Sequence, residues 1–219
     1  MILLAVAMLF VGCKKSDMVD ADALNTTNRA NPFKSVEYYP APNQTRMKTQ
    51  LSGADAQPLE GGLLTIKQLK LETFSTNGQP QAVATAPDCI YDTPNRLANS
   101  TGKLFLQNGD GRIRAEGEGF LWRQNDSSLT ISNNVKTLIA SAMLAAANLN
   151  AQTNLDAATN LTLISAHMAD FDLNARHAIY SGDVHVTDPQ MKLTCEWLIA
   201  NLPQSGRVNR IVAETNVVI

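Results

Sequence analysis

Apolar and polar residues alternate in short runs from residue 63 onward, and this period of two most constrains what the chain can fold into. Clusters rich in Gly, Asn, Asp and Pro separate the runs, such as QNGDG (107–111) and PQSG (203–206). In a strand, alternation places every second side chain on one face, and clusters of this composition form turns. Many short alternating runs with frequent turn signals predict an all-β domain over residues 63–219, a sandwich, jelly roll or open barrel.

One internal segment departs from this alternation. Residues 140–160 are rich in Ala, Asn and Thr. The spacing of Met143, Leu144 and Ala147 allows a short helix. A crossover loop fits the same composition, and both interpretations stay open.

The domain contains an internal repeat, with units at about 69–139 and 161–219. An offset of 80 residues aligns positions 84–106 without a gap, so that Arg96 meets Arg176 and Gly102 meets Gly182. A second offset of 98 aligns RIRAE (112–116) with RIVAE (210–214), which makes residues 191–203 an extra segment of the second unit. We expect each unit to form strand, turn and strand, with the glycine allowing a sharp bend. Two stacked units would bury one continuous apolar face.

The repeat also predicts which side chains face inward. These candidates share one parity along their strands: Leu104, Leu106, Ile113, Ala115, Leu121, Val184, Val186, Ile211 and Ala213. Such a face can line an open apolar groove, since each buried methylene contributes about 0.8 kcal/mol. It can equally form the closed core of a β-sandwich, and alternation alone does not decide between the two.

The N-terminus predicts export and a lipid anchor. Residues 1–12 form an unbroken apolar run, too short to span a bilayer but suited to a signal peptide. The following Cys13 resembles the acylated cysteine of a bacterial lipobox, although no Lys or Arg precedes the run. We expect a membrane-anchored periplasmic lipoprotein, without a preference for either membrane. The alternative is an ordinary signal peptide followed by an incidental cysteine.

We expect residues 13–62 to form a lipid-anchored flexible tether, because Pro and Gly interrupt every apolar period in this segment. Two cysteines remain beyond it, Cys89 and Cys195. In an oxidising compartment they can pair. Each is also compatible with a small, buried, free thiol.

Several classes of function find no support in the sequence. The formal charge of −2 gives no basic footprint for nucleic acid. His167, His177 and His185 have no carboxylate at metal-ligand spacing. No nucleophile and base pair at a recognisable spacing, and no phosphate-binding glycine loop joins a strand to a helix. We therefore expect no metal, no cofactor and no catalysis.

The second unit resembles a known family. Its segments AIYSGDVHV (178–186), MKLTCEWL (191–198) and VNRIVAETNVVI (208–219) are similar to the OstA-type repeat of the lipopolysaccharide transport proteins LptA, LptC and periplasmic LptD. In the first unit, APDCIYD (86–92) and residues 112–135 resemble the LptC-related branch.

This resemblance implies an OstA-type β-jelly roll, open and U-shaped in section, that shields lipid A acyl chains. Such domains join end to end through edge strands and, in LptC-like members, receive lipopolysaccharide from an ABC transporter. The expected function is a non-catalytic transport scaffold, with the lipid anchor replacing a transmembrane one. The alternative is a structural or adhesive β-sandwich lipoprotein. Because the last residues lie mid-strand by pattern, we also expect a truncated reading frame, or an edge that awaits a partner.

Overall fold

The computed structural model describes residues 31–140, 161–189, 191–201 and 211–219. These residues form thirteen strands and one short 3₁₀ turn at Glu60–Gly62, which confirms the predicted all-β class. Among them, no helix is long and apolar enough to cross a membrane. The signal peptide, Cys13, most of the segment 140–160 and residues 202–210 lie outside the described ranges, and so do the predictions that fall on them.

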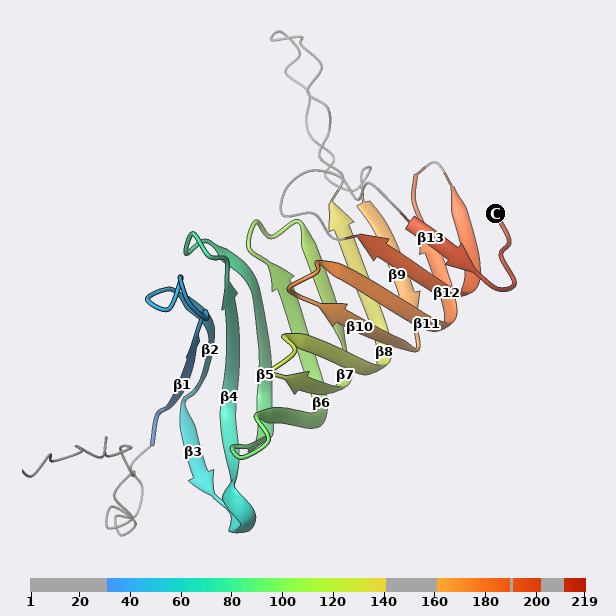
Figure 1. The fold of residues 1–219 in the computed structure, drawn as a ribbon. Helices are drawn as coiled ribbons and strands as arrows, with labels where there is room; N and C mark the ends of the chain where they lie inside the picture. Colours follow the sequence, from blue (N-terminus) through green and yellow to red (C-terminus); the bar gives the residue numbers. More distant parts are fainter. Residues whose placement is uncertain (1–30, 141–160, 190, 202–210) are drawn as a thin grey trace, which may run out of the picture.

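The strands follow the chain in order (Figure 1). Their bounds are β1 Phe33–Tyr38, β2 Met47–Gly53, β3 Asp55–Pro58, β4 Leu63–Phe74, β5 Pro80–Asp92, β6 Leu97–Asn108, β7 Ile113–Arg123, β8 Ser128–Ala140, β9 Leu161–Ala166, β10 Met168–Asp172, β11 His177–Thr187, β12 Lys192–Asn201 and β13 Ile211–Glu214. All pairings are antiparallel and join the strands into one sheet, in the order β1-β2-β4-β5-β6-β7-β8-β10-β11-β12-β13, with β3 beside β4 and β9 between β8 and β11.

The long strands bend near their middle, which folds the sheet into a jelly-roll-like U. Register shifts mark the bend at Ser100/Lys103 in β6, Glu116/Glu118 in β7 and Ser181/Val184 in β11. At Gly182 the backbone has φ +76°, a conformation that glycine adopts without strain. The predicted sharp bends at Gly102 and Gly182 are thus found within strands, and not at turns between them.

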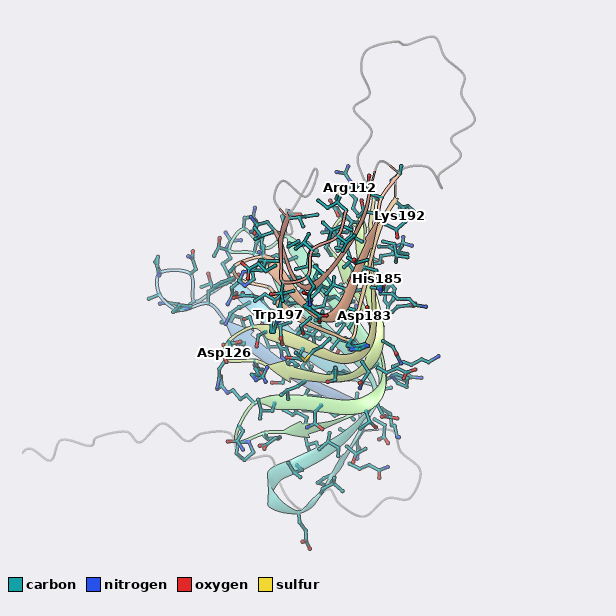
Figure 2. All side chains as sticks on the ribbon, turned by 90° about the vertical axis from the view of Figure 1, so that its right-hand side faces the viewer. Arg112, Asp126, Asp183, His185, Lys192 and Trp197 are labelled. Carbon is teal, nitrogen blue, oxygen red and sulfur yellow. The ribbon has the colours of Figure 1, made fainter. Side chains whose placement is uncertain are left out.

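We call the two halves of the sheet the upper arm and the lower arm. The upper arm holds residues 69–74, 80–85, 103–108, 113–116, 135–140, 161–166, 184–187 and 192–195. The lower arm holds residues 63–67, 88–92, 97–100, 120–123, 128–131, 168–172, 177–181, 197–201 and 211–214. Figure 2 shows the arms diverging from the bend near Asp183 toward Arg112 at the end of the upper arm and Asp126 at the end of the lower arm.

The sheet begins thirty residues earlier than the sequence predicted. Strand β1 pairs with β2, and β2 pairs with residues 70–73 of β4, so the prediction of a flexible tether is wrong from residue 33 onward. Phe33 packs against Tyr91 of the lower arm with ring centroids 5.6 Å apart. The β1–β2 hairpin therefore covers the interior at the N-terminal end of the U.

The structure also corrects the alignment of the repeat. Ile113 and Ala115 lie in the upper arm, whereas Ile211 pairs with Ala200 in the lower arm. Ala115 pairs with Leu106 of β6, and Leu193 of β12 pairs with Val186, the equivalent residue of β11, so Leu193 is the upper-arm counterpart of Ala115. Strand β12 is thus the equivalent of β7 at an offset of 78 residues, and residues 192–201 are not an insertion.

The two arms contribute different side chains to a single core. Large aromatic residues point inward from the lower arm, and small or aliphatic residues face them from the upper arm. The buried aromatic residues are Tyr91, Phe120, Trp122, Phe171 and Tyr180. Large side chains opposite small ones allow the two facing layers of a core to interdigitate. The core is one continuous cluster along the U.

Candidate functional site

An apolar cavity of about 360 Å³ opens at the mouth of the U, where the free ends of the arms approach each other. We call it the mouth pocket. Its wall comes from the β4–β5 and β6–β7 turns of the upper arm and from the β10–β11 turn of the lower arm. The lining residues are Asn77, Gln79, Pro80, Gln81, Ala82, Leu106, Asn108, Gly109, Asp110, Ile113, Phe171, Asp172, Leu173 and Arg176. Its volume falls at the lower end of the range for small-ligand sites.

The floor of the pocket includes two of the predicted groove residues, Leu106 and Ile113. Both retain a little exposure, 5% and 7% respectively, because they lie next to the opening. The structure adds Ala82, Phe171 and Leu173, which come from strands and turns distant in the sequence. An alkyl chain placed here would exchange water for apolar contacts on both arms.

Four other groove candidates lie deeper in the U. Leu104, Ala115, Val184 and Val186 are at most 2% exposed and pack in the core. In the described conformation they contact other side chains, so they would meet a lipid only if the arms moved apart.

Leu121 does not face inward as predicted. Gly119 adopts φ +73° and the register shifts between Glu116 and Glu118, so the parity of β7 changes after this point. Phe120 and Trp122 are buried in its place, while Leu121 is only partly buried opposite Thr130 of β8. Ile211 and Ala213 are likewise only partly buried, and they pack against the core from the lower arm.

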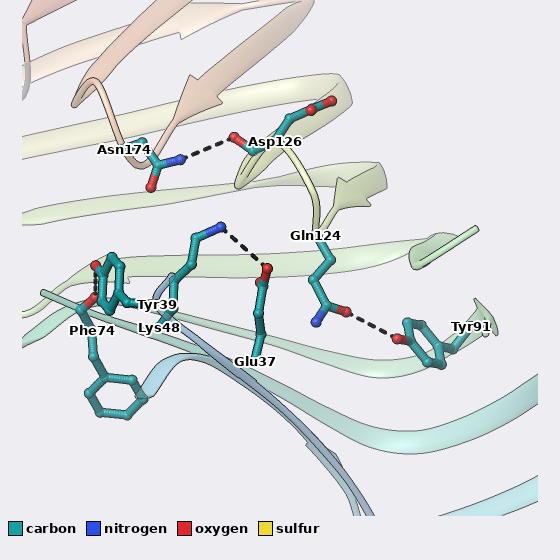
Figure 3. A network of polar contacts seen from close by, with 8 residues as sticks. All are labelled: Glu37, Tyr39, Lys48, Phe74, Tyr91, Gln124, Asp126 and Asn174. Atoms are coloured by element: carbon teal, nitrogen blue, oxygen red, sulfur yellow. Dashed lines mark hydrogen bonds and ion pairs between the residues drawn. The ribbon is translucent and has the colours of Figure 1, made fainter. Parts of the chain in front are cut away.

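The lower rim of the mouth is a stack of tight turns. Three successive turns end at Arg96, Ser127 and Arg176. Each of these residues has a left-handed φ angle, between 52° and 56°. The turns bind one another through the backbone: Gln124 N donates to Arg96 O, and Leu173 N donates to Ser127 O, each at 3.1 Å. Asn174 Nδ2 adds a bond to Asp126 O at 3.4 Å (Figure 3). The β10–β11 turn is thereby held in place against its neighbour.

Arg176 projects at this rim beside Tyr39. The Tyr39 hydroxyl donates to Phe74 O at 2.6 Å on the upper arm (Figure 3). Burial raises the pKa of Tyr39, and the positive charge of Arg176 opposes this effect. Arg176 is itself only partly exposed. Within the described ranges, no carboxylate forms an ion pair with its guanidinium.

The two carboxylates of the pocket wall already have local partners. Asp172 Oδ1 accepts bonds from the backbone N–H groups of Asn174 and Ala175, at 2.9 and 2.7 Å. Asp110 Oδ1 accepts one from Arg112 N at 3.1 Å, and its Oδ2 lies 3.7 Å from Arg112 Nε. Both carboxylates therefore stabilise the turns in which they lie.

A further ion pair lies at the N-terminal end of the mouth. Lys48 Nζ is 3.5 Å from Glu37 Oε1, and both side chains are largely buried, at 15% and 19% exposure (Figure 3). The second oxygen of Glu37 has no hydrogen-bond partner among the described residues. This pair fixes β1 to β2 at the point where the hairpin covers the interior.

The two thiols do not meet. Cys89 on β5 and Cys195 on β12 are both free and buried, and β6, β7, β8, β10 and β11 separate their strands in the sheet. Burial, with a smaller contribution from Asp88, raises the pKa of Cys89 to about 12. A disulfide between them within one chain is therefore excluded by position.

The histidines lie apart from any metal-like cluster. His185 Nε2 is 2.9 Å from Asp183 Oδ1 on the outer side of the bend (Figure 2). No group of three or more His, Cys, Asp or Glu side chains gathers anywhere in the described part of the chain.

A second hollow, of about 650 Å³, lies outside the U over β5–β8. Charges of opposite sign line it on neighbouring strands, with Lys103 opposite Glu118 and Glu116 opposite Lys136. Cross-strand pairs of this kind are typical of a solvated sheet face. The mouth pocket is the stronger candidate because its floor is apolar.

Most of the mouth pocket was absent from the sequence prediction. Asn77, Ala82 and Leu173 carry no motif, and only the pairing of Arg96 with Arg176 in the repeat marked that turn. No family model matches the chain, and no characterised protein shows significant similarity to it. The fold and the mouth pocket are therefore the features that indicate a function.

Proposed function

We propose that this chain is a non-catalytic lipid-transport scaffold of the cell envelope, of the OstA-like and LptC-related type. It takes up acyl chains of lipopolysaccharide between the arms of the U and passes them to similar β-domains. The observation that supports this proposal most directly is the apolar mouth pocket, formed by both arms of an open sheet. A groove of Leu, Ile and Ala side chains binds alkyl chains without any catalytic group.

The edges of the sheet support the transfer step. Among the described strands, β1 pairs only with β2, and β13 pairs only with β12. Each therefore presents backbone N–H and C=O groups on one side, where a strand from another protein can add. The expected partners are other Lpt-type β-domains and an ABC transporter. The proposed place of action is the periplasm, with the chain anchored through acylated Cys13.

Photo-crosslinking in cells tests the proposal. A benzophenone amino acid at Leu106 or Ile113 should capture lipopolysaccharide, because both positions line the mouth pocket. Lys103 and Arg114 provide matched controls on β6 and β7, since their side chains point to the outer face. Capture at the control positions alone, or at none of the four, would overturn the proposal.

The second candidate is a structural or adhesive β-sandwich lipoprotein. The filled core supports this candidate, because the side chains of the two arms already pack against one another along the U. For this candidate the same crosslinkers would capture no lipid, and removal of the chain would leave lipopolysaccharide export unchanged.

A further inference from the structure

We infer that the mouth pocket binds a single alkyl chain with an oxyanion head group, and that Arg176 is the residue that holds the head group. This inference rests on the proposed function and specifies the part of the lipid that enters. It combines an apolar floor with one cation at the rim.

The dimensions of the pocket set the number of chains. Leu104, Ala115 and Val184 do not line this cavity of about 360 Å³ and are buried in the core. A lipid with several chains would need the arms to separate along their length. One chain fits between Leu106 and Ile113 on the upper arm and Phe171 on the lower arm without this change.

The charge at the rim selects the head group. Asp172 and Asp110 face the pocket, but each already accepts backbone hydrogen bonds within its own turn. Arg176 is the cation of the pocket wall, and no described carboxylate pairs with it. A guanidinium that is only partly exposed to water binds a carboxylate or phosphate more strongly than a fully solvated one does. Asn77 and Asn108 add side-chain amides as hydrogen-bond donors on the opposite wall.

The turn aims Arg176 at this position. Its φ of +56° places it at the end of the β10–β11 turn, which Asp172 and the neighbouring turn hold. Arg96 has the same φ of +56° at the end of the equivalent β5–β6 turn, but it does not line the pocket. The repeat thus supplies two arginines with one backbone geometry, of which only Arg176 meets the apolar floor.

Calorimetry with the purified full-length chain tests the inference. The probes are dodecyl phosphate below its critical micelle concentration, dodecanol below its solubility limit, and inorganic phosphate. We expect dodecyl phosphate to bind on the order of tenfold more tightly than dodecanol, since a charge-assisted hydrogen bond raises the affinity by about tenfold or more. Inorganic phosphate alone should give no measurable binding.

Variants of the two arginines complete the experiment. Arg176→Gln should reduce the affinity for dodecyl phosphate to that for dodecanol, and Arg96→Gln should leave both affinities unchanged. Equal effects of the two substitutions, or equal affinities for the two amphiphiles, would overturn the head-group assignment. If the proposed transport function were wrong and the head-group assignment right, dodecyl phosphate would still bind through Arg176, but lipopolysaccharide would not be captured in cells.

Discussion

The Tyr91 hydroxyl donates a hydrogen bond of 3.0 Å to Gln124 Oε1, which joins β5 to the β7–β8 turn in the interior of the lower arm (Figure 3). Both side chains are buried, with 3% exposure each. A buried amide oxygen that loses its donor retains the full penalty of leaving water. The pair therefore couples the rim of the mouth to the core.

Removal of that hydroxyl should destabilise the protein. We expect Tyr91→Phe to lower the free energy of unfolding by about 1–3 kcal/mol, because Gln124 is left without its donor. Urea unfolding followed by tryptophan fluorescence measures the change. Tyr38→Phe is the control, since that side chain is 56% exposed and its loss of a hydroxyl should have little effect. Equal losses in the two variants would contradict the role assigned to the pair.

The bend of β7 should tolerate no side chain at Gly117. A Cβ there would lie 2.5 Å from Ile131 Cγ2 and 2.8 Å from Asn133 O. Gly117→Ala should therefore destabilise the fold by about 1–3 kcal/mol, as overpacking of a core does. Gly102 lies at the bend of the neighbouring β6, where a Cβ would come only within 3.3 Å of Ser100 Oγ. A thermal melt should show Gly102→Ala close to wild type, and the reverse order would rule out this account of the bend.

The change of parity in β7 predicts unequal effects for two leucines that the alternation treats alike. Leu104 is 2% exposed in the core, so Leu104→Ala should lower the free energy of unfolding by about 2–5 kcal/mol. Leu121 is on the outer face, so Leu121→Ala should lower it by less than about half as much. Chemical denaturation of both variants makes the comparison. A larger loss of unfolding free energy for Leu121→Ala than for Leu104→Ala would indicate that Leu121 points inward, as the alternation predicted.

Alkaline pH should weaken the fold through Cys89. An unfolded thiol ionises near pH 8.5, at roughly its reference pKa, whereas burial and Asp88 raise the folded-state pKa to about 12. Between these values the unfolded state releases a proton that the folded state keeps. The contribution of Cys89 to stability is thus complete below the unfolded pKa, and it falls by about 1.4 kcal/mol per pH unit above it. Urea unfolding between about pH 7.5 and 9.5 should show a shallower decline for Cys89→Ala, and identical slopes would refute this.

The sequence predicted the strands well wherever local alternation determines them. Leu104 with Leu106 and Val184 with Val186 are buried as expected, because a strand with one apolar face has only one way to bury it. The prediction failed where the backbone interrupts the period of two. Gly119, with φ +73°, reversed the parity at Leu121, and nothing in a residue count signals that change. The strands β1–β3 were missed because they are short and lie among prolines at 40, 42 and 58.

The mouth pocket could not be predicted from the sequence, for a different reason. It forms where Ala82 and Leu106 of one arm meet Phe171 and Arg176 of the other. These residues come together only because the sheet bends and twists, and no local pattern encodes that distance. The repeat did identify the two arginine turns as equivalent, but it could not show that only one of them faces the pocket.

The central claim is that a lipid enters between the arms at the mouth, and methyl NMR with a spin-labelled, single-chain phospholipid tests it most directly. The nitroxide should broaden the methyl signal of Ile113, which lines the mouth pocket. It should leave Ile90 sharp, although that side chain is 41% exposed, because it lies on the outer face of the lower arm. Equal broadening of Ile90 and Ile113, or none at either, would contradict the claim.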